Sequence, residues 1–123
     1  FLPAVMAGGK VPLVRCGGAM LQVPMEAQGL APGSEVTLAI RPEDVHVLQN
    51  GFDAINVVET RLNDVEFLGP FHRLHLQLAL QSGGPLNLTA YLDPDRQGKA
   101  LRKGCELSVH LPVEALRVYP AIA

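Results

Sequence analysis

The residues that could carry chemistry in this chain are few and stand in no catalytic pattern. Lys10 and Lys99 each follow a glycine, but neither has the earlier glycine or the following Ser or Thr that a phosphate-binding loop needs. Ser34, Ser82 and Ser108 lack the sequence surroundings of an activated nucleophile. The sequence therefore predicts a chain that is not an enzyme and has no catalytic or cofactor-binding residue.

The histidines and cysteines show no metal-binding spacing either. His72 and His75 are three residues apart in a predicted strand, so their side chains point to opposite faces and do not bind one ion together. His72 shares its face with leucines, whereas His75 is expected at the surface. Cys16 and Cys105 are more typical of core thiols than of ligands, and no spacing signature pairs them. The sequence predicts no metal site.

Charged residues offer two candidate interaction sites. The first is the corner Arg41, Pro42, Glu43 and Asp44, where a strand is expected to end because proline breaks the ladder. The carboxylates of Glu43 and Asp44 could accept backbone N–H bonds in a single turn, with Arg41 as a counter-charge. The second is a basic patch that is either a solvated loop or a contact for an acidic partner or an oxyanion: Arg96, Lys99, Arg102 and Lys103.

Composition limits the classes of protein that the chain can belong to. It has 123 residues, of which 48% are hydrophobic and 18% charged, as in a globular domain rather than a disordered segment. The net charge is −2, there is no Trp, and only 5% of residues are aromatic. A nucleic-acid-binding protein usually shows a basic excess and aromatic stacking residues, so that class is disfavoured.

No targeting or membrane segment is visible in the sequence. No stretch approaches the ~20 apolar residues that span a bilayer, and no basic segment followed by an apolar one opens the chain. Two cysteines do not make a disulfide framework, so a cytosolic location is expected. Because the first residue is Phe1 rather than Met, we expect the chain to be part of a longer protein.

Alternation of apolar and polar residues predicts strands with one buried face. It is clearest at residues 35–41, 71–80, 86–92 and 105–111, weaker at residues 11–16, 19–24, 55–62 and 116–119, and resumes at residues 45–48. Residues 25–34 are expected to form a loop, and residues 93–103 a polar connection with room for one helical turn. The pattern predicts a small, mostly antiparallel all-β domain that closes into a barrel or a sandwich.

Two segments of the chain resemble each other. Residues 33–40 align with residues 104–111, and the ungapped match continues with Glu43 over Glu114 and Val45 over Leu116. Upstream, residues 17–23 resemble residues 83–89 after a shift in register. Duplication of a unit and repeated use of common strand and turn chemistry both explain the match. In either case it predicts strand, bend and strand at both places.

The residues from Gly33 to Asp44 resemble the segment "G-x-x-V-x-L-A-I-R-P-E-D" of the TOBE domain. That domain is the C-terminal regulatory part of the ATP-binding subunits of bacterial ABC importers of the maltose, sulfate, iron and polyamine type. Residues 65–69 are similar to the family's "v-x-y-L-G" segment, and residues 104–118 to its closing segment. Residues 116–120 lack the Phe-Asp that closes many members, so a contact made there in relatives is not carried over.

The resemblance implies an OB-like antiparallel β-barrel with additional strands, formed by residues 1–123 as one domain. Residues 1–8 would be a linker from an upstream ATPase domain, which would hold the ATP and Mg²⁺. It also implies a non-catalytic regulatory and dimer-contact role in which Arg41, Pro42 and Glu43 form a structural corner. The expected partners are the ATPase domain, a second copy of the subunit and, indirectly, the membrane subunits, at the inner face of the cytoplasmic membrane.

An alternative that the resemblance leaves open is a module that binds small oxyanions. Related barrels in molybdate transport bind oxyanions between subunits. In this chain the backbone N–H groups of the glycine pairs at 17–18 and 83–84, together with the basic patch, are the candidates for such a role.

Overall fold

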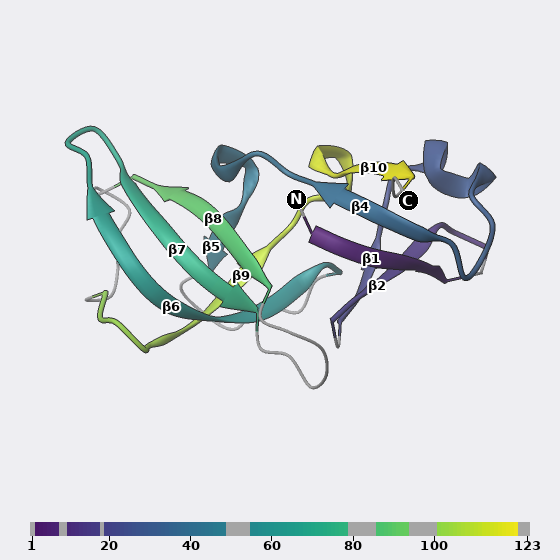
Figure 1. Ribbon diagram of the computed structural model, residues 1–123. Helices are drawn as coiled ribbons and strands as arrows, with labels where there is room; N and C mark the ends of the chain where they lie inside the picture. The colour runs from purple at the N-terminus through teal and green to yellow at the C-terminus, as the bar shows by residue number, and fades with distance from the viewer. Residues whose placement is uncertain are drawn as a thin grey trace.

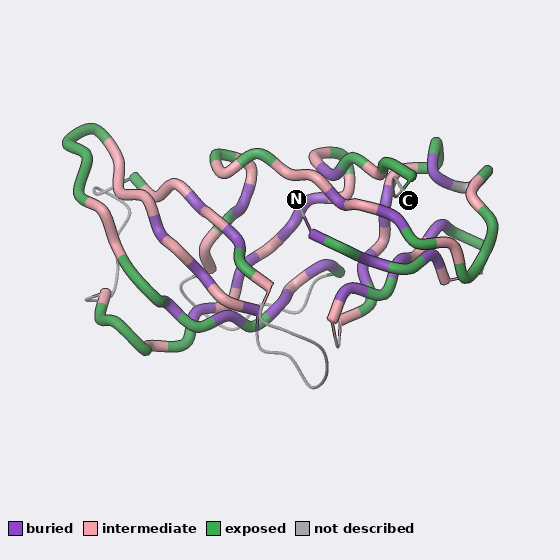
Figure 2. The backbone as a smooth tube through the Cα atoms, in the orientation of Figure 1, coloured by how far each residue is buried: buried purple, intermediate pink, exposed green. Residues whose placement is uncertain are grey.

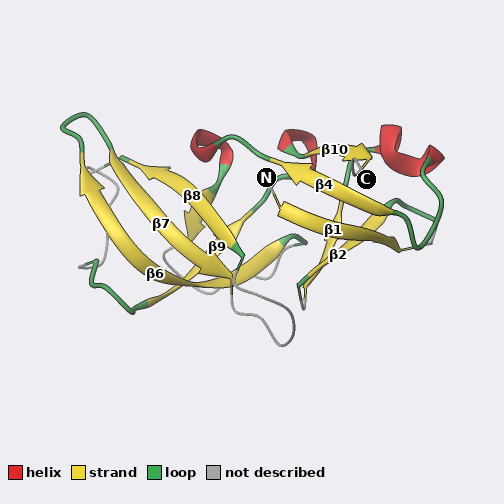
Figure 3. Cartoon of the chain, viewed as in Figure 1, coloured by secondary structure: helices red, strands yellow, loops and turns green. Residues whose placement is uncertain are grey.

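A computed structural model describes residues 2–7, 10–17, 19–48, 55–78, 86–93 and 101–120. These residues form strands joined by turns and short 3₁₀ helices (Figures 1 and 3), which confirms the all-β class. The strands are β1 (Leu2–Ala7), β2 (Leu13–Cys16), β3 (Ala19–Gln22), β4 (Glu35–Ala39), β5 (His46–Leu48), β6 (Val57–Phe67), β7 (His72–Leu78), β8 (Asn87–Leu92), β9 (Glu106–His110) and β10 (Arg117–Pro120). The 3₁₀ helices are η1 (Met25–Gly29), η2 (Pro42–Asp44) and η4 (Val113–Ala115).

The strands form two five-stranded antiparallel sheets that exchange one strand each. The first sheet has the order β10-β4-β1-β2-β3 and the second β5-β9-β6-β7-β8. Strand β5 belongs to the first half of the chain but pairs with β9 in the second sheet. Strand β10 belongs to the second half of the chain but pairs with β4 in the first sheet. Each sheet curls into an OB-like half-barrel, and the two lie side by side (Figure 1). The exchange makes each half depend on the other for an edge strand.

The sequence repeat corresponds to a repeat of structure. Strand β9 and η4 each begin 71 positions after β4 and η2, as Glu106 follows Glu35 and Val113 follows Pro42. The pairing repeats as well, because Leu38 of β4 lies opposite Val118 just as Val109 of β9 lies opposite Val47. The prediction of strand, bend and strand at both places is confirmed.

The predicted register between the two hairpins was wrong by one residue. Aligning residues 17–23 with residues 83–89 places Leu21 over Asn87. The pairing of β2 with β3 and of β7 with β8 instead makes Leu88 the structural counterpart of Leu21. Leu21 lies opposite Val14 in β2, and Leu88 lies opposite Leu76 in β7. Because side chains alternate between faces, a slip of one residue would exchange a buried leucine for an exposed asparagine. Burial therefore fixes the register that turn chemistry alone left open.

The core is built by the alternation that the sequence showed. In β7 the leucines Leu74, Leu76 and Leu78 are buried and the residues between them are half-buried. Buried and half-buried segments accordingly alternate along the strand in Figure 2. Strands from both sheets contribute to one apolar cluster, in which Leu38 and Val109 are fully enclosed. Burying such a side chain contributes about 1.5–3 kcal/mol.

Three segments differ from expectation. Residues 2–7, assigned to a linker, form the central strand β1, in which Leu2 and Met6 are buried while Pro3 interrupts the strand signal. Residues 25–29 form η1 inside the predicted loop. Strand β6 runs beyond the predicted residue 62 to Phe67, across an irregularity between Leu62 and Asp64. The predicted turn at residues 83–84 and most of the connection 93–103 lie outside the described residues.

Asn56 joins the two halves of the chain. It has a φ of 63°, a left-handed conformation in which asparagine is favoured over most residues. Its Oδ1 accepts a bond from the N–H of Gln22 (2.7 Å), and its Nδ2 donates to the carbonyls of Gln22 (2.8 Å) and Leu111 (3.0 Å). The N–H of Leu111 donates in return to the Asn56 carbonyl (2.9 Å). One residue thus ties the end of β3 to the end of β9.

We expect Asn56→Ala to lower the free energy of unfolding by about 2–3 kcal/mol, because it leaves buried backbone groups without partners and strains the backbone. Asn56→Gly keeps the backbone conformation and loses only the side-chain bonds, so its cost is smaller. Urea denaturation measures both. Asn87→Ala, at an exposed position of β8, is the control and changes stability by less than about 0.5 kcal/mol. Equal effects at positions 56 and 87 would contradict the role of Asn56.

Gly33 and Gly104 occupy equivalent turns before β4 and β9, and both have a φ of 87°. A Cβ at either position would meet no atom within 4 Å, so backbone strain alone sets the cost of a side chain. We expect Gly33→Ala and Gly104→Ala each to destabilise the fold by about 1 kcal/mol. Gly29→Ala is the matched control, since its Cβ also meets nothing but its φ is not positive. Thermal unfolding in which all three variants match the parent would refute the argument.

Candidate functional site

The predicted charged corner lies between β4 and β5, as expected, but its side chains act differently. The backbone closes the turn itself: the N–H of Asp44 donates to the carbonyl of Arg41 (2.9 Å), and that of Val45 to Pro42 (3.3 Å). No side chain caps η2, so the expectation that Glu43 and Asp44 would accept these N–H bonds was wrong. The physical reason is that the turn's own carbonyls already satisfy the donors. Buried Val45 anchors the corner in the core.

A second corner, η4, repeats this arrangement between β9 and β10. The N–H of Ala115 donates to the carbonyl of Pro112 (3.0 Å), and that of Leu116 to Val113 (3.2 Å). Leu116 is fully buried and takes the place of Val45, while Glu114 takes the place of Glu43 and is exposed. Both corners therefore present an acidic side chain to solvent over a buried apolar anchor.

Two grooves flank the edge strand β10 and join these corners into one surface, which we call the corner surface. A groove of about 660 Å³ runs between the corners and is lined by Arg41, Pro42, Asp44, Glu114, Arg117 and Tyr119, among others. A groove of about 780 Å³ on the other side of β10 is lined by η1 and η4 and shares Glu114 and Arg117 with the first. Figure 3 shows η1, η2 and η4 along one side of the molecule. The corner surface is thus concave and carries both signs of charge.

The side chains on the corner surface differ in whether they form hydrogen bonds within the protein. The guanidinium of Arg117 donates to the carbonyls of Glu114 and Leu116, both at 2.9 Å, and so holds η4 in place. Arg41 and Glu43 are exposed and make no side-chain hydrogen bond or ion pair within the described ranges. The sequence predicted that Arg41 is a counter-charge for Glu43 and Asp44. Among the described residues Arg41 forms no ion pair with either carboxylate. The side chains of Arg41 and Glu43 remain available to an external group.

Two large apolar side chains on this surface were missed by the sequence analysis. Met25 on η1 is 58% exposed, and Tyr119 on β10 is 50% exposed. Met25 stood in a predicted loop and Tyr119 at the end of a weak strand, so nothing in the local pattern marked them. The exposure of Tyr119 follows from the position of β10 at the edge of its sheet.

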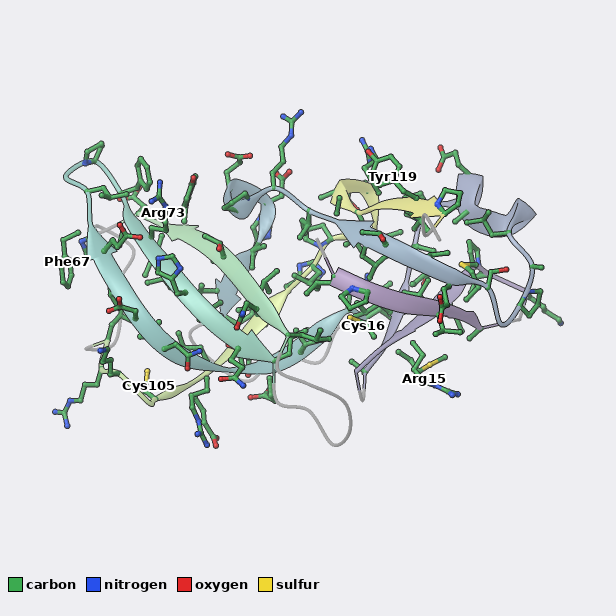
Figure 4. All side chains as sticks on the ribbon, in the orientation of Figure 1. Arg15, Cys16, Phe67, Arg73, Cys105 and Tyr119 are labelled. Atoms are coloured by element: carbon green, nitrogen blue, oxygen red, sulfur yellow. The ribbon has the colours of Figure 1, made fainter. Side chains whose placement is uncertain are left out.

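The basic patch is only partly described. Arg102 and Lys103 are exposed in the turn before β9, whereas Arg96 and Lys99 lie outside the described residues. Cys105, two residues after Lys103, and Tyr119 of the corner surface lie far apart in Figure 4. The described part of the patch therefore does not belong to the corner surface.

A charged cluster that the sequence analysis did not single out lies on the outer face of the β6–β7 hairpin. Oε1 of Glu66 lies 2.5 Å from Nε2 of His75 and 3.4 Å from a guanidinium nitrogen of Arg73. The hydrogen bond from His75 is the main cause that lowers the pKa of Glu66, and the charge of Arg73 adds to it. Arg73 also lies over the ring of Tyr91, 5.7 Å from its centre. Since these side chains are about 40% exposed, the cluster stabilises the hairpin only weakly.

The structure confirms the opposite faces predicted for His72 and His75 and the buried position predicted for Cys16, whereas Cys105 is not fully in the core. His72 lies beside Phe67 in a T-shaped ring contact, on the face opposite to His75. Cys16 is buried, which raises the pKa of its thiol, and Cys105 is half-buried; both are free thiols. No group of three or more His, Cys, Asp or Glu side chains that could hold a metal ion occurs in the described part of the chain.

Comparison with known proteins gives three findings. A family model described as a TOBE domain matches residues 38–118, about two thirds of the chain. The sulfate/thiosulfate import ATP-binding protein CysA 2 of Chromobacterium violaceum is 36% identical over 124 aligned residues, which cover all of this chain and 32% of the relative. The cytoplasmic molybdate-binding protein ModG, solved with molybdate bound, matches with a TM-score of 0.72 and 19% identity over 98% of this chain and 94% of that chain.

The lengths of these matches limit what each implies. The chain spans about a third of the curated relative, whereas it matches nearly the whole solved chain. At 19% identity the structural match shows a shared fold. Among the described residues no helix is long and apolar enough to span a membrane.

The lowered pKa of Glu66 predicts how stability depends on pH. The contribution of its carboxylate is present above its unfolded pKa, about 4.3, and is lost as the pH falls through the lower pKa of the folded state. We therefore expect Glu66→Gln to lower the urea midpoint at neutral pH and to match the parent at acid pH below the folded-state pKa of Glu66. Glu106→Gln, at an exposed carboxylate on β9, is the control. A difference between parent and Glu66→Gln that persists unchanged at low pH would contradict this assignment.

Proposed function

This chain belongs to the TOBE domain family, and we propose that it is the non-catalytic regulatory and dimer-contact domain of the ATP-binding subunit of a bacterial ABC importer. Support for the parent protein comes from the relative that is named as a sulfate/thiosulfate import ATP-binding protein. Because the chain spans only about a third of that relative, the ATPase domain, the second subunit and the membrane subunits are partners that we propose. The proposed location is the cytoplasmic side of the membrane.

The proposed role is mechanical rather than chemical. The exchanged strands interlock the two half-barrels, so we expect the domain to move as one body. Such a body, attached to each ATPase domain, can hold two subunits together while the catalytic domains open and close. An effector that binds one spacing of the two bodies more tightly shifts the equilibrium by its difference in affinity for the two states.

The observation that carries the proposal is the corner surface. Arg41 and Glu43 lie at the η2 corner and make no side-chain hydrogen bond or ion pair within the described part of the chain. Tyr119 lines the same groove as Arg41, and Met25 lines the groove on the other side of β10; both side chains are half exposed. Arginine and tyrosine are typical of residues that dominate the energy of protein interfaces. Opposite charges side by side also suit a contact with a second copy, in which each group meets its opposite across a twofold axis.

ATP and Mg²⁺ would be bound by the ATPase domain and not by this chain. The residue after Lys10 is Val11, where a phosphate-binding loop has the Ser or Thr whose hydroxyl reaches the metal. The direct experiment is to read and express the natural gene. We expect an ATPase domain before Phe1 and ATP hydrolysis by the whole protein, with none by residues 1–123 alone. A natural gene without such a domain would overturn the proposal.

Binding of an oxyanion is the second candidate function, and the fold match to a molybdate-binding protein supports it. The corner surface argues less for it, since Asp44 and Glu114 line the same groove as Arg41 and Arg117 and offset their charge. A thermal shift with molybdate or sulfate that disappears in Lys103→Glu would favour this function over the first.

Charge reversal tests the contact in the natural full-length protein. We expect Arg41→Glu and Glu43→Arg each to raise the dissociation constant of the subunit dimer about threefold to tenfold, because each places like charges together. Combining the two reversals restores association if the contact is twofold. Analytical ultracentrifugation measures all three.

Lys103→Glu is the matched control, since it makes the same change of charge in the other candidate patch. It should leave the dimer unchanged. A dimer that is insensitive to both corner variants, or weakened only by Lys103→Glu, would rule out the corner surface as the contact.

A further inference from the structure

Two histidines face each other where the exchanged strand β5 meets its new sheet. His46 of β5 and His110 of β9 are direct partners in the antiparallel register. Their ring centres lie 5.9 Å apart with 52° between the ring planes. His46 is exposed and His110 half-buried, so solvent reaches the pair.

The other two histidines differ from this pair in their surroundings. His75 is bonded to Glu66, whereas His72 packs against Phe67 and its Nδ1 is buried without a hydrogen-bond partner among the described residues. In the described part of the chain the imidazoles of His46 and His110 make no hydrogen bond or ion pair, and their only ring contact is with each other.

We propose that His46 and His110 form a two-histidine site for a divalent transition-metal ion such as Zn²⁺, Ni²⁺ or Cu²⁺. Imidazole is a preferred ligand for these ions. Two metal–nitrogen bonds of about 2.0–2.1 Å in an open tetrahedral site place the ring centres roughly 5–6 Å apart, close to the distance between these rings. Small rotations of the side chains would bring both nitrogens onto one ion.

The neighbours of the pair define its coordination. Val57 of β6 lies on the other side of His110 and offers no ligand. In the next row on the same face Glu59 is held by the hydroxyl of Ser108 at 2.5 Å. No third His, Cys, Asp or Glu joins the histidines among the described residues, so water completes the coordination. The carboxylate of Glu59 still favours a cation at this face through its charge.

A bound ion would connect the two halves of the chain. It would bridge β5, which belongs to the first half by sequence, to β9 of the second, beside the bonds between Asn56 and Leu111. Metal binding would therefore strengthen the strand exchange and stabilise the folded state in proportion to the logarithm of the metal concentration.

Thermal unfolding of the chain with Zn²⁺, Ni²⁺ or Mg²⁺ tests this site. We expect Zn²⁺ and Ni²⁺ in excess to raise Tm by roughly 3–6 °C, reversibly with EDTA, and Mg²⁺ to have no effect because it prefers oxygen ligands. His46→Gln and His110→Gln should abolish the increase. His75→Gln, at a histidine on the same sheet with a different partner, should keep it.

A second measurement covers variants that fold poorly. Substoichiometric Cu²⁺ should broaden the ring NMR signals of His46 and His110 in the parent and leave those of His72 and His75 sharp. An increase in Tm that survives in His46→Gln, an equal response in all variants, the lack of any shift at millimolar Zn²⁺, or broadening centred on His75 would each refute the site.

Discussion

The exchange of β5 and β10 between the sheets is the constraint on which the rest of the structure depends. Without it each sheet would lose an edge strand, and residues such as Leu38 and Val109 would lose a neighbour on one side. The bonds of Asn56 to Gln22 and Leu111 join the end of β3 in the first sheet to the end of β9 in the second. Since each sheet takes an edge strand from the other half of the chain, we expect the two sheets to unfold in one cooperative transition.

The charged corners follow from this exchange. A strand that must leave its own sheet needs a sharp bend, and in the first corner Pro42 supplies it because its ring fixes φ and removes a donor from the ladder. Backbone bonds close the bend, and Val45 or Leu116 fixes it in the core. The side chains of Arg41 and Glu43 then make no hydrogen bond or ion pair within the described part of the chain. A feature required by the fold thereby becomes a surface that can serve a partner.

Local features explain which predictions succeeded. Alternation at residues 35–39 and 106–110 identified β4 and β9 because each strand has one buried face. The glycines at 33 and 104 marked the turns before these strands, since both need a positive φ. Strand β1 was missed because Pro3 and Ala4 weaken its pattern, although pairing on both sides stabilises it. The opposition of His46 and His110 was invisible because 64 positions separate them and only pairing brings them together.

The sequence by itself determined the all-β class, the repeated strand–bend–strand units and the family, because these depend on local alternation, turn residues and a contiguous motif. Tertiary structure alone decided which half receives β5 and β10, how the hairpins align, and which charges remain unpaired. The physical reason is that these outcomes depend on contacts between residues far apart in the chain. Such contacts form only when burial of both sheets selects one pairing from many that local preferences allow.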